Sequence, residues 1–270
     1  YLPAAQKQHA QLAGVLSKLA DVFQVKDLLQ DILVNKTIRT ELINIICKKL
    51  NVPDVMEELL ALNNAELASR LITGTYLKTN TLEKFLSQNK FALPPLPNLF
   101  FTRDSAMVVN KKVIIGNMAN KIRIMEAILM KYIFSYHPQL QCHEFLFDAT
   151  QDETPDVTFE GGDILVARED AVLIGMSERT SIPGIDYLIE QFKSAGRIKN
   201  IFVVILPKAR ATIHLDMVFT MVDTDKAVVY PPLILTKQAV DVNYIDISKP
   251  AAPKFIRHDY LLDALKTVGI

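Results

Sequence analysis

The feature that most constrains the fold is an internal repeat in the second part of the chain. Two short apolar runs joined by a polar turn are followed by a segment with helical periodicity, and the whole pattern then recurs. Asp104 opens the first run and precedes Gly116 by the same interval that separates Asp163 from Gly175, while Asp216 precedes a third hairpin signal. Repeats of this kind predict modules arranged around a common axis, so we expect the three aspartates to share one pocket.

Around this repeat the sequence divides into a helical part and a mixed part. Up to about residue 90, apolar residues recur at helical spacing between stop signals such as Gly74, and a proline-rich stretch at 93–97 ends the pattern. The helices expected there are 5–23, 25–34, 37–50, 53–61, 64–73 and 81–88. Beyond it we expect hairpins at 106–109/113–116, 164–167/171–175 and 217–222/227–230, helices at 121–135, 183–195 and 260–268, and a strand at 201–206. This order predicts an α/β (α+β) fold with an inserted helical bundle.

The charge balance and the cysteine and histidine content narrow the range of partners. Thirty basic residues face thirty acidic ones, which gives no positive field for nucleic acid or an anionic membrane. No apolar run approaches the ~20 residues of a membrane span. Two cysteines are too few for a disulfide framework, so the cytoplasm is the expected compartment. The five histidines lack the spacing of metal ligands, so we expect no metal. We also expect both ends, Tyr1 and Ile270, to be cut rather than natural.

Several carboxylates in one pocket require a cation. Like charges held close together raise each other's pKa unless a cation neutralises them. A guanidinium suits this role because it is planar, permanently charged and pairs with carboxylates through parallel N–H donors. On a strand, His214 and Asp216 would share one face, which makes His214 a candidate proton donor and acceptor. The pair Gly161-Gly162 would let the backbone turn sharply and approach a ligand. Each residue alone is more simply a turn, cap or core residue, and only the joint order favours a site.

Four segments, in this order, carry a family resemblance. They are Asn98-Leu99-Phe100-Phe101-Thr102-Arg103-Asp104, Phe159-Glu160-Gly161-Gly162-Asp163, Ser177-Glu178-Arg179-Thr180-Ser181 and His214-Leu215-Asp216. The residues and the spacing of these segments resemble the motifs of the arginine deiminase family, within the guanidino-group-modifying superfamily. The resemblance covers nearly the whole chain. It implies a pentein-type propeller of ββαβ-like modules, incomplete here. It also implies hydrolysis of L-arginine to L-citrulline and ammonia without a cofactor, and leaves room for a homo-oligomer.

The resemblance further implies roles for individual residues. Glu160 and His214 would be the catalytic pair that handles protons. The substrate-binding residues would be Asn98, Asp104, Arg123, Asp163, Arg179 and Asp216. Within this set the aspartates would surround the guanidinium, and Arg123 and Arg179 would meet the carboxylate of the substrate. Two departures stand out, because Ser105 replaces the usual proline and the run around Arg123 is less arginine-rich than in the family.

The family reaction needs a cysteine thiolate, which attacks the guanidino carbon and forms a thiouronium intermediate. Cys47 lies in an amphipathic helical pattern and is expected to be a small core residue. Cys142 neighbours His143, but this context does not match that of the family's nucleophile. We therefore expect the nucleophile to be absent from these 270 residues and the chain alone to be inactive.

The family pattern also predicts a division of the chain and leaves two alternatives open. We expect a remnant of the first propeller module at 1–23, a helical-bundle insertion at 24–92, and propeller modules with the guanidinium site at 93–270. In the first alternative, a related hydrolase or amidinotransferase would act on agmatine, a methylated arginine or peptidyl arginine, although the Arg123 and Arg179 pair favours a free amino acid. In the second, the chain would be a non-catalytic arginine-binding module.

Overall fold

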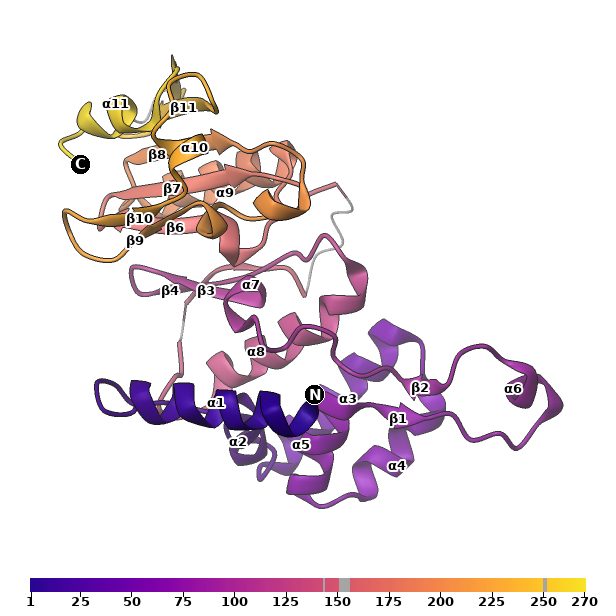
Figure 1. Cartoon of the computed structure of the whole chain (residues 1–270). Helices are drawn as coiled ribbons and strands as arrows, with labels where there is room; N and C mark the ends of the chain where they lie inside the picture. The colour runs from indigo at the N-terminus through magenta and orange to yellow at the C-terminus, as the bar shows by residue number, and fades with distance from the viewer. Residues whose placement is uncertain (143, 151–155, 250–251) are drawn as a thin grey trace. The chain divides into compact units, whose positions relative to one another are not determined.

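The computed structural model describes residues 1–142, 144–150, 156–249 and 252–270. The chain forms two compact units, residues 1–95 and residues 96–270. The first unit is mainly helical, and the second is built on sheets (Figure 1). The mixed α/β class expected from the sequence is therefore confirmed. Among the residues that the structure describes, no helix has both the length and the apolar character needed to cross a membrane.

The N-terminal unit is a group of helices with one small strand pair. Its elements are Leu2–Leu16 (α1), Val25–Ile32 (α2), Lys36–Leu50 (α3), the 3-10 turn Pro53–Val55 (η1), Met56–Ala61 (α4), Asn64–Thr73 (α5), Thr75–Tyr76 (β1), Leu82–Leu86 (α6) and Phe91–Leu93 (β2). Asn35 caps the start of α3 with its side chain, and Asn51 ends that helix in the left-handed conformation, with φ 54°. Asn63 and Glu66 form a capping box at the start of α5. These helices therefore begin and end where polar caps satisfy the backbone.

The first helix departs from the expectation drawn from its periodicity. The pattern predicts a helix over 5–23, whereas α1 ends at Leu16 and buries none of its residues. Leu12, Val15 and Leu19, which the pattern places on a packed face, are exposed. Most buried residues of this unit lie instead between the start of α2 and the end of α5, and Thr75 of β1 and Leu93 of β2 are also buried. A helical repeat of apolar residues thus predicted the helix but not its packing.

In the residues that the structure describes, the C-terminal unit contains three sheets. Its elements are Thr102–Ser105 (α7), Ala106–Val109 (β3), Lys112–Ile115 (β4), Lys121–Arg123 (η2), Ile124–Tyr136 (α8), Phe145–Asp148 (β5), Gly161–Asp163 (η3), Ile164–Arg168 (β6), Ala171–Met176 (β7), Ile182–Ala195 (α9), Asn200–Ile205 (β8), Arg210–Thr212 (η4), Leu215–Met217 (η5), Phe219–Met221 (β9), Ala227–Val229 (β10), Pro231–Ile234 (α10), Asp241–Asp246 (β11), Lys254–His258 (β12) and Leu261–Lys266 (α11). Within the described residues, the strand orders are β3-β4-β5, β12-β11-β8-β7-β6 and β10-β9.

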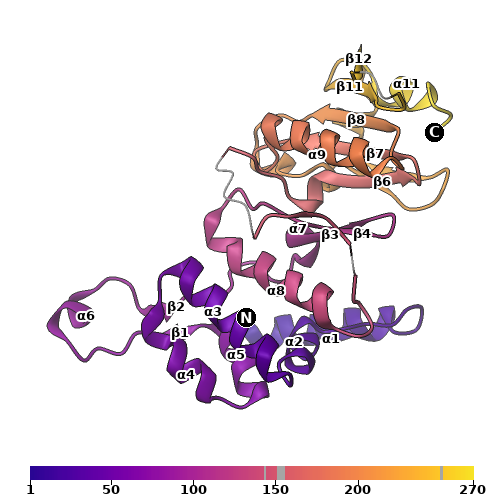
Figure 2. The same cartoon turned by 180° about the vertical axis from the view of Figure 1, so that it is seen from behind.

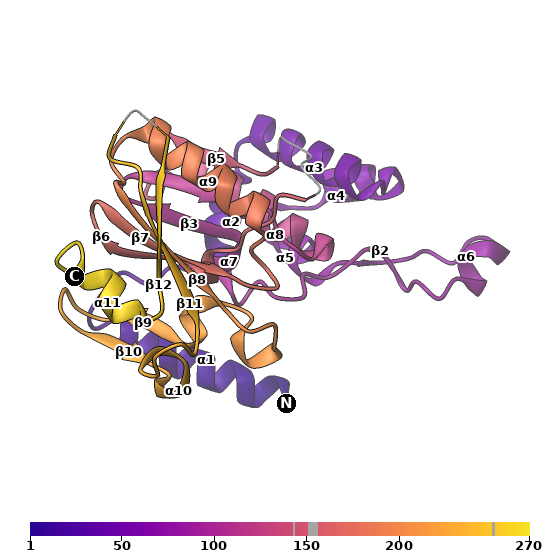
Figure 3. The ribbon, with the colours of Figure 1, turned by 90° about the horizontal axis from the view of Figure 1, so that it is seen from above.

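The repeat expected from the sequence takes the same form twice. β3 and β4 pair antiparallel, α8 follows, and β5 returns parallel to β4. In the same way β6 and β7 pair antiparallel, α9 follows, and β8 returns parallel to β7. α9 packs against β7 (Figure 2) and also contacts β5 of the preceding module (Figure 3). Two ββαβ modules are therefore present and in contact.

The third occurrence of the pattern folds differently. β9 and β10 form the expected hairpin, but the helix that follows is only the short α10. The next strand, β11, pairs with β8 of the second module rather than with its own hairpin, and β12 then pairs with β11. The pattern did not predict β5, β11 or β12. Closure of these modules into a propeller stays a prediction.

The two central strands of the five-stranded sheet, β7 and β8, are buried on both faces, as their continuous apolar sequences indicate. Neighbouring residues of β7 alternate between two hydrophobic clusters. Val172 and Ile174 join the cluster that contains residues of α9, and Leu173 joins the cluster that contains residues of α11. The strand ends that lead to the polar turns described next are therefore held by packing on both sides.

Candidate active site

Each aspartate of the repeat lies in a short helical turn directly before a strand. Asp104 is in α7 before β3, Asp163 is in η3 before β6, and Asp216 is in η5 before β9. α7 contacts η3, and η3 contacts η5. The three strand entrances therefore converge, as the repeat predicts.

Glu160, which directly precedes η3, joins residues from two other turns. It is fully buried, and its Oε2 lies 2.9 Å from Nε2 of His214. Its Oε1 accepts a hydrogen bond from the backbone N–H of Ala119 at 3.1 Å. Nδ1 of His214 lies 3.8 Å from Oδ1 of Asp104, and both residues are buried. We call Asp104, Glu160, His214, Arg123 and Glu126 the acid cluster.

The local backbone around His214 corrects one expectation. His214 and Asp216 do not share a strand face, because residues 215–217 form the 3-10 turn η5 and His214 directly precedes it. The side chain of His214 reaches Glu160, whereas Asp216 is half-buried. The turn, and not strand alternation, directs His214 toward the cluster.

The guanidinium of Arg123 lies inside the cluster. Its Nη1 is 2.9 Å from Oδ2 of Asp104 and 3.5 Å from Oε2 of Glu160. On the other side, Nε and Nη2 lie 2.9 Å and 2.8 Å from Oε2 of Glu126. Nη2 also donates to the carbonyl of Asn98 at 3.4 Å. The buried Arg123 is therefore a guanidinium held by carboxylates, whereas the resemblance assigns it to the carboxylate of the substrate.

Glu126 is the member of the cluster that the sequence analysis missed. It is fully buried on the mainly apolar α8, and its Oε1 accepts the backbone N–H of Asn98 at 3.0 Å. A signal was available, because Glu126 is the one acidic residue in the sequence of that helix and follows Arg123 at the i,i+3 spacing of helical ion pairs.

Asp163 is buried and bonded to protein donors on both oxygens. Oδ2 accepts from Oγ of Ser177 and from Oγ1 of Thr180, both at 2.6 Å, and Oδ1 accepts from the backbone N–H of Leu215 at 2.8 Å. These contacts join the 177–180 turn to η5. The geometry is that of a positioning residue, and the expected contact with substrate stays a prediction.

The remaining predicted residues are less enclosed. Arg179 is half-buried in the 177–180 turn, where its backbone N–H bonds to Oγ of Ser177 at 2.9 Å. Asn98 is exposed and contacts the cluster through its backbone. In the ranges that the structure describes, neither side chain makes a hydrogen bond or an ion pair. Both are therefore open to a ligand.

Gly161 and Gly162 are required for space around the turn η3. Neither has a positive φ. A Cβ on Gly161 would overlap the carbonyl of Arg103, and a Cβ on Gly162 would come within 2.6 Å of the ring of His214. The two glycines lie in the 3-10 turn η3, where a turn is expected, and they also let α7 and His214 pack against it.

Burial and charge shift the protonation of the cluster. Burial raises the pKa of Asp163 to about 6, against the opposing effect of its hydroxyl and backbone donors. Burial alone would lower the pKa of His214, but Glu160 and the surrounding carboxylates outweigh it and the pKa stands above the ordinary 6.5. Burial raises the pKa of Asp216, and the charge of His214 opposes this. The environment thus favours a protonated His214.

The acid cluster and its neighbours hold more acidic than basic groups. The acidic groups are Asp104, Glu126, Glu160, Asp163 and Asp216. The basic groups that contact them or act on their pKa are Arg103, Arg123 and His214. This imbalance favours a further cation as ligand.

A metal ion is one such cation. One ligand atom from each of Asp104, Glu160 and His214 lies within 4.8 Å of the others, and two carboxylates with an imidazole form a set that transition metals accept. Nη1 of Arg123 lies 2.9 Å from Asp104 and 3.5 Å from Glu160, so a metal ion at these carboxylates would have to displace it. The expectation of no metal site stays a prediction.

Neither cysteine is placed as a nucleophile for the cluster. Cys47 is buried in α3 of the N-terminal unit, and burial raises the pKa of its thiol, which disfavours the thiolate. The thiol of Cys142 contacts the carbonyl of Lys111, beyond β3, whereas Asp104 precedes that strand. His143, which neighbours Cys142 in the sequence, lies outside the described residues.

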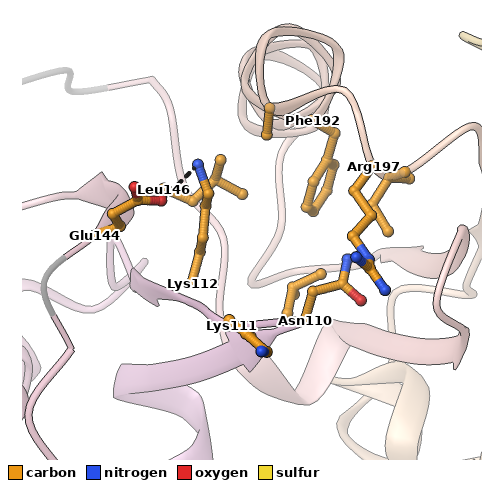
Figure 4. A pocket seen from close by; sticks show the side chains of 10 residues that line it. Asn110, Lys111, Lys112, Glu144, Leu146, Phe192 and Arg197 are labelled. Atoms are coloured by element: carbon orange, nitrogen blue, oxygen red, sulfur yellow. Dashed lines mark ion pairs between the residues drawn. The ribbon is translucent and has the colours of Figure 1, made fainter.

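A separate pocket of about 460 Å³ lies near Cys142. Figure 4 shows it between the β3–β4 turn, β5 and the end of α9. Its labelled lining residues are Asn110, Lys111, Lys112, Glu144, Leu146, Phe192 and Arg197. It includes none of the residues predicted for the site.

Known proteins resemble the chain over almost its whole length. The sequence profile of a family described as arginine deiminase matches residues 1–268. A curated arginine deiminase of Bacillus cereus (strain ATCC 10987 / NRS 248) is 34% identical, over 99% of this chain and 69% of its own length. An arginine deiminase of Staphylococcus aureus (strain Newman) is 30% identical with the same coverage.

Similar solved structures were also found, at lower similarity. A dimethylarginine dimethylaminohydrolase adduct with 4-chloro-2-hydroxymethylpyridine is 24% identical, with TM-score 0.39 over 51% of each chain. The product-bound N-terminal domain of a cyanobacterial arginine dihydrolase is 20% identical, with TM-score 0.40 over 52% of this chain and 46% of that chain. TM-scores this low support no argument about the fold.

Proposed function

This chain belongs to the arginine deiminase family, and we propose that its acid cluster binds L-arginine for hydrolysis to L-citrulline and ammonia. The observation that carries the proposal is that the guanidinium of Arg123 is bound inside the cluster by carboxylates. The cluster already binds one guanidinium through Asp104 and Glu126, and its acidic groups outnumber its basic ones. A second guanidinium is therefore a ligand that matches both its geometry and its charge.

In the proposed complex, Asp104 and Glu160 pair with the substrate guanidinium, and Arg179 meets the α-carboxylate. Pairing with these two carboxylates holds the guanidino carbon in place for attack, because two-point pairing sets both the position and the plane of the guanidinium. Arg123 joins Arg179 once it leaves Asp104. A ligand without an α-carboxylate, such as agmatine, would lose this second set of contacts.

The chemistry requires a thiolate that neither Cys47 nor Cys142 supplies. Its sulfur forms a bond to the guanidino carbon, and the carbon–nitrogen bond to the departing ammonia breaks. Protonated His214 donates the proton that this ammonia takes. Neutral His214 then accepts one proton from the water that attacks the thiouronium carbon. The carbon–sulfur bond then breaks, the electron pair returns to the thiolate, the remaining hydroxyl proton passes to solvent, and citrulline is released. Glu160 orients the imidazole throughout.

Calorimetric titration of the chain with L-arginine and with agmatine tests the binding part of this proposal. We expect L-arginine to bind more tightly, and Asp104→Asn to abolish detectable binding. Asp223→Asn is the matched control, because Asp223 is exposed and outside the cluster. Absence of arginine binding by the unaltered chain would refute the proposal.

A non-catalytic arginine-binding module is the second candidate, and it would bind arginine through the same acid cluster. Citrulline formation by the protein made from its complete gene distinguishes the two. Production of citrulline establishes the enzyme, whereas tight arginine binding without citrulline establishes the binding module. An agmatine preference would instead point to a related enzyme acting on another guanidine.

We further propose the pentein-type propeller as the architecture, with the division 1–23, 24–92 and 93–270. The two ββαβ modules support it, since their equivalent strand entrances converge on one cluster. The cytoplasm as compartment and a homo-oligomer as assembly are likewise proposals.

A further inference from the structure

We propose that Glu126 is a positioning residue that makes the site select guanidines carrying an α-carboxylate. Glu126 stays paired with Arg123 while Arg123 leaves its ion pair with Asp104, so that Asp104 can bind the substrate. This inference rests on the proposed function, because it concerns how the same site accepts arginine.

The starting observation is a conflict over Asp104. Its Oδ2 is taken by Nη1 of Arg123 at 2.9 Å, and that nitrogen also lies 3.5 Å from Oε2 of Glu160. A substrate guanidinium that pairs with these carboxylates needs the same oxygens. Arg123 must therefore withdraw Nη1 when the substrate binds.

Glu126 makes this withdrawal feasible. Nε and Nη2 of Arg123 lie 2.9 Å and 2.8 Å from its Oε2, on the side of the guanidinium away from Asp104. An unpaired charge in so buried a place is strongly unfavourable. Because Glu126 is itself fully buried, it can keep Arg123 paired after Asp104 is released.

The carboxylate of Glu126 is also fixed in place. Its Oε1 accepts the backbone N–H of Asn98 at 3.0 Å, and Nη2 of Arg123 donates to the carbonyl of the same residue at 3.4 Å. Asn98 is one of the residues expected at the amino-acid end of the substrate. Glu126 therefore ties Arg123 to the segment where an α-carboxylate would lie, and the freed Nη1 is the donor available to it.

The experiment compares the affinities of the full chain for L-arginine and agmatine by calorimetry. Glu126→Gln keeps the size of the side chain but removes its charge. We expect the ratio of the two affinities, arginine over agmatine, to fall about tenfold, the loss that follows when one charge-assisted hydrogen bond is misplaced. General loss of negative charge would act in the opposite direction, since it weakens doubly charged agmatine more than singly charged arginine.

A second variant and a control keep the test decisive. Arg123→Lys retains the charge but loses the side-on pairing with Glu126, so it should lower the ratio similarly, and Glu126→Gln added to it should cause no further fall. If Glu126→Gln fails to fold, as judged by circular dichroism, Arg123→Lys alone carries the test. Glu169→Gln is the control, because Glu169 pairs with Arg197 in an exposed ion pair of the same unit.

The outcomes separate this inference from the proposed function. If the unaltered chain binds neither ligand, the proposed function fails. If it prefers arginine, and Glu126→Gln or Arg123→Lys leaves the ratio unchanged, only the role of Glu126 is overturned. A fall in the ratio caused equally by Glu169→Gln would also overturn it.

Discussion

The acid cluster and the pocket in Figure 4 lie toward opposite ends of β3, and each contains an ion pair of the same length. Arg123 and Asp104 are separated by 2.9 Å in the cluster, and Lys112 and Glu144 by 2.9 Å at the pocket. The side chains of the first pair are 6% and 10% exposed, and those of the second are 38% and 68% exposed. Distance therefore does not distinguish the two pairs, but access to water does.

This difference in exposure to water indicates where chemistry can take place in the molecule. Water screens the charges at the pocket, so its ion pair contributes little to stability. In the cluster, burial raises the cost of every unpaired charge and makes each carboxylate depend on its partner. The open pocket has the volume of a ligand site, whereas the cluster has the coupled charges that binding and proton transfer need.

The largest expected effect comes from removing the charge of Arg123. Arg123→Met leaves Asp104 and Glu126 without their cation, so we expect a loss of about 3–5 kcal/mol in the free energy of unfolding. Urea unfolding at neutral pH measures it. A loss below about 1 kcal/mol would mean that water reaches the cluster, and the contrast with the pocket would fail.

The second prediction concerns pH and Asp163. Its pKa is about 6 in the folded chain against an ordinary 3.8, so the folded state binds the proton more tightly between these values. The stability from this proton is present below pH 3.8 and is lost as the pH rises through 6. At ~1.4 kcal/mol per pKa unit the loss is about 3 kcal/mol. Asp163→Asn lacks this titration, so its stability relative to the unaltered chain should rise by that amount.

Urea unfolding of both proteins between pH 4 and pH 7 tests this prediction. The raised pKa of His214 gives a loss of the same sign, but only as the pH rises above 6.5. The raised pKa of Asp216 gives a loss of the same sign in both proteins, so the difference between the two proteins from pH 4 to pH 6 isolates Asp163. Stability curves that run parallel in that interval would show that Asp163 keeps an ordinary pKa.

The third prediction tests the tight packing behind Asp163. A Cβ on Gly175 would overlap Oδ1 of Asp163 and come within 2.9 Å of Cβ of Leu215. Gly175→Ala should therefore cost about 1–3 kcal/mol of unfolding free energy. Gly14→Ala is the control, since nothing lies within 4 Å of a Cβ there, and it should stabilise α1 by roughly 0.5–1 kcal/mol. Equal effects of the two substitutions would contradict the packing argument.

The sequence predicted those parts of the fold whose signals are local. Each of the three hairpins has both strands and its turn within a short stretch, and all three were predicted. β5 and β11 have no such signal, because β5 pairs with β4 across the whole of α8 and β11 pairs with β8 across a hairpin. Their partners are decided by tertiary packing and not by neighbouring residues.

The same limit applies to the site. The repeat placed Asp104, Asp163 and Asp216 at equivalent strand entrances, and the structure brings these turns together. The partners of Arg123 could not be predicted, because a guanidinium takes whichever carboxylates the fold places nearby. Glu126 was missed because it belongs to a helix and not to a motif, although its i,i+3 spacing from Arg123 was a signal, and its burial shows its importance.

The smallest expected effect comes from breaking the exposed ion pair at the pocket. Lys112→Met breaks the pair with Glu144 at the pocket, and we expect a change of at most about 0.5 kcal/mol in unfolding free energy and none in arginine binding. Whatever change remains should vanish in concentrated salt, since the pair is exposed to screening. A loss comparable to that of Arg123→Met would mean that ion-pair length, and not burial, sets the strength of these pairs. A loss of arginine binding would move the site from the acid cluster to the pocket.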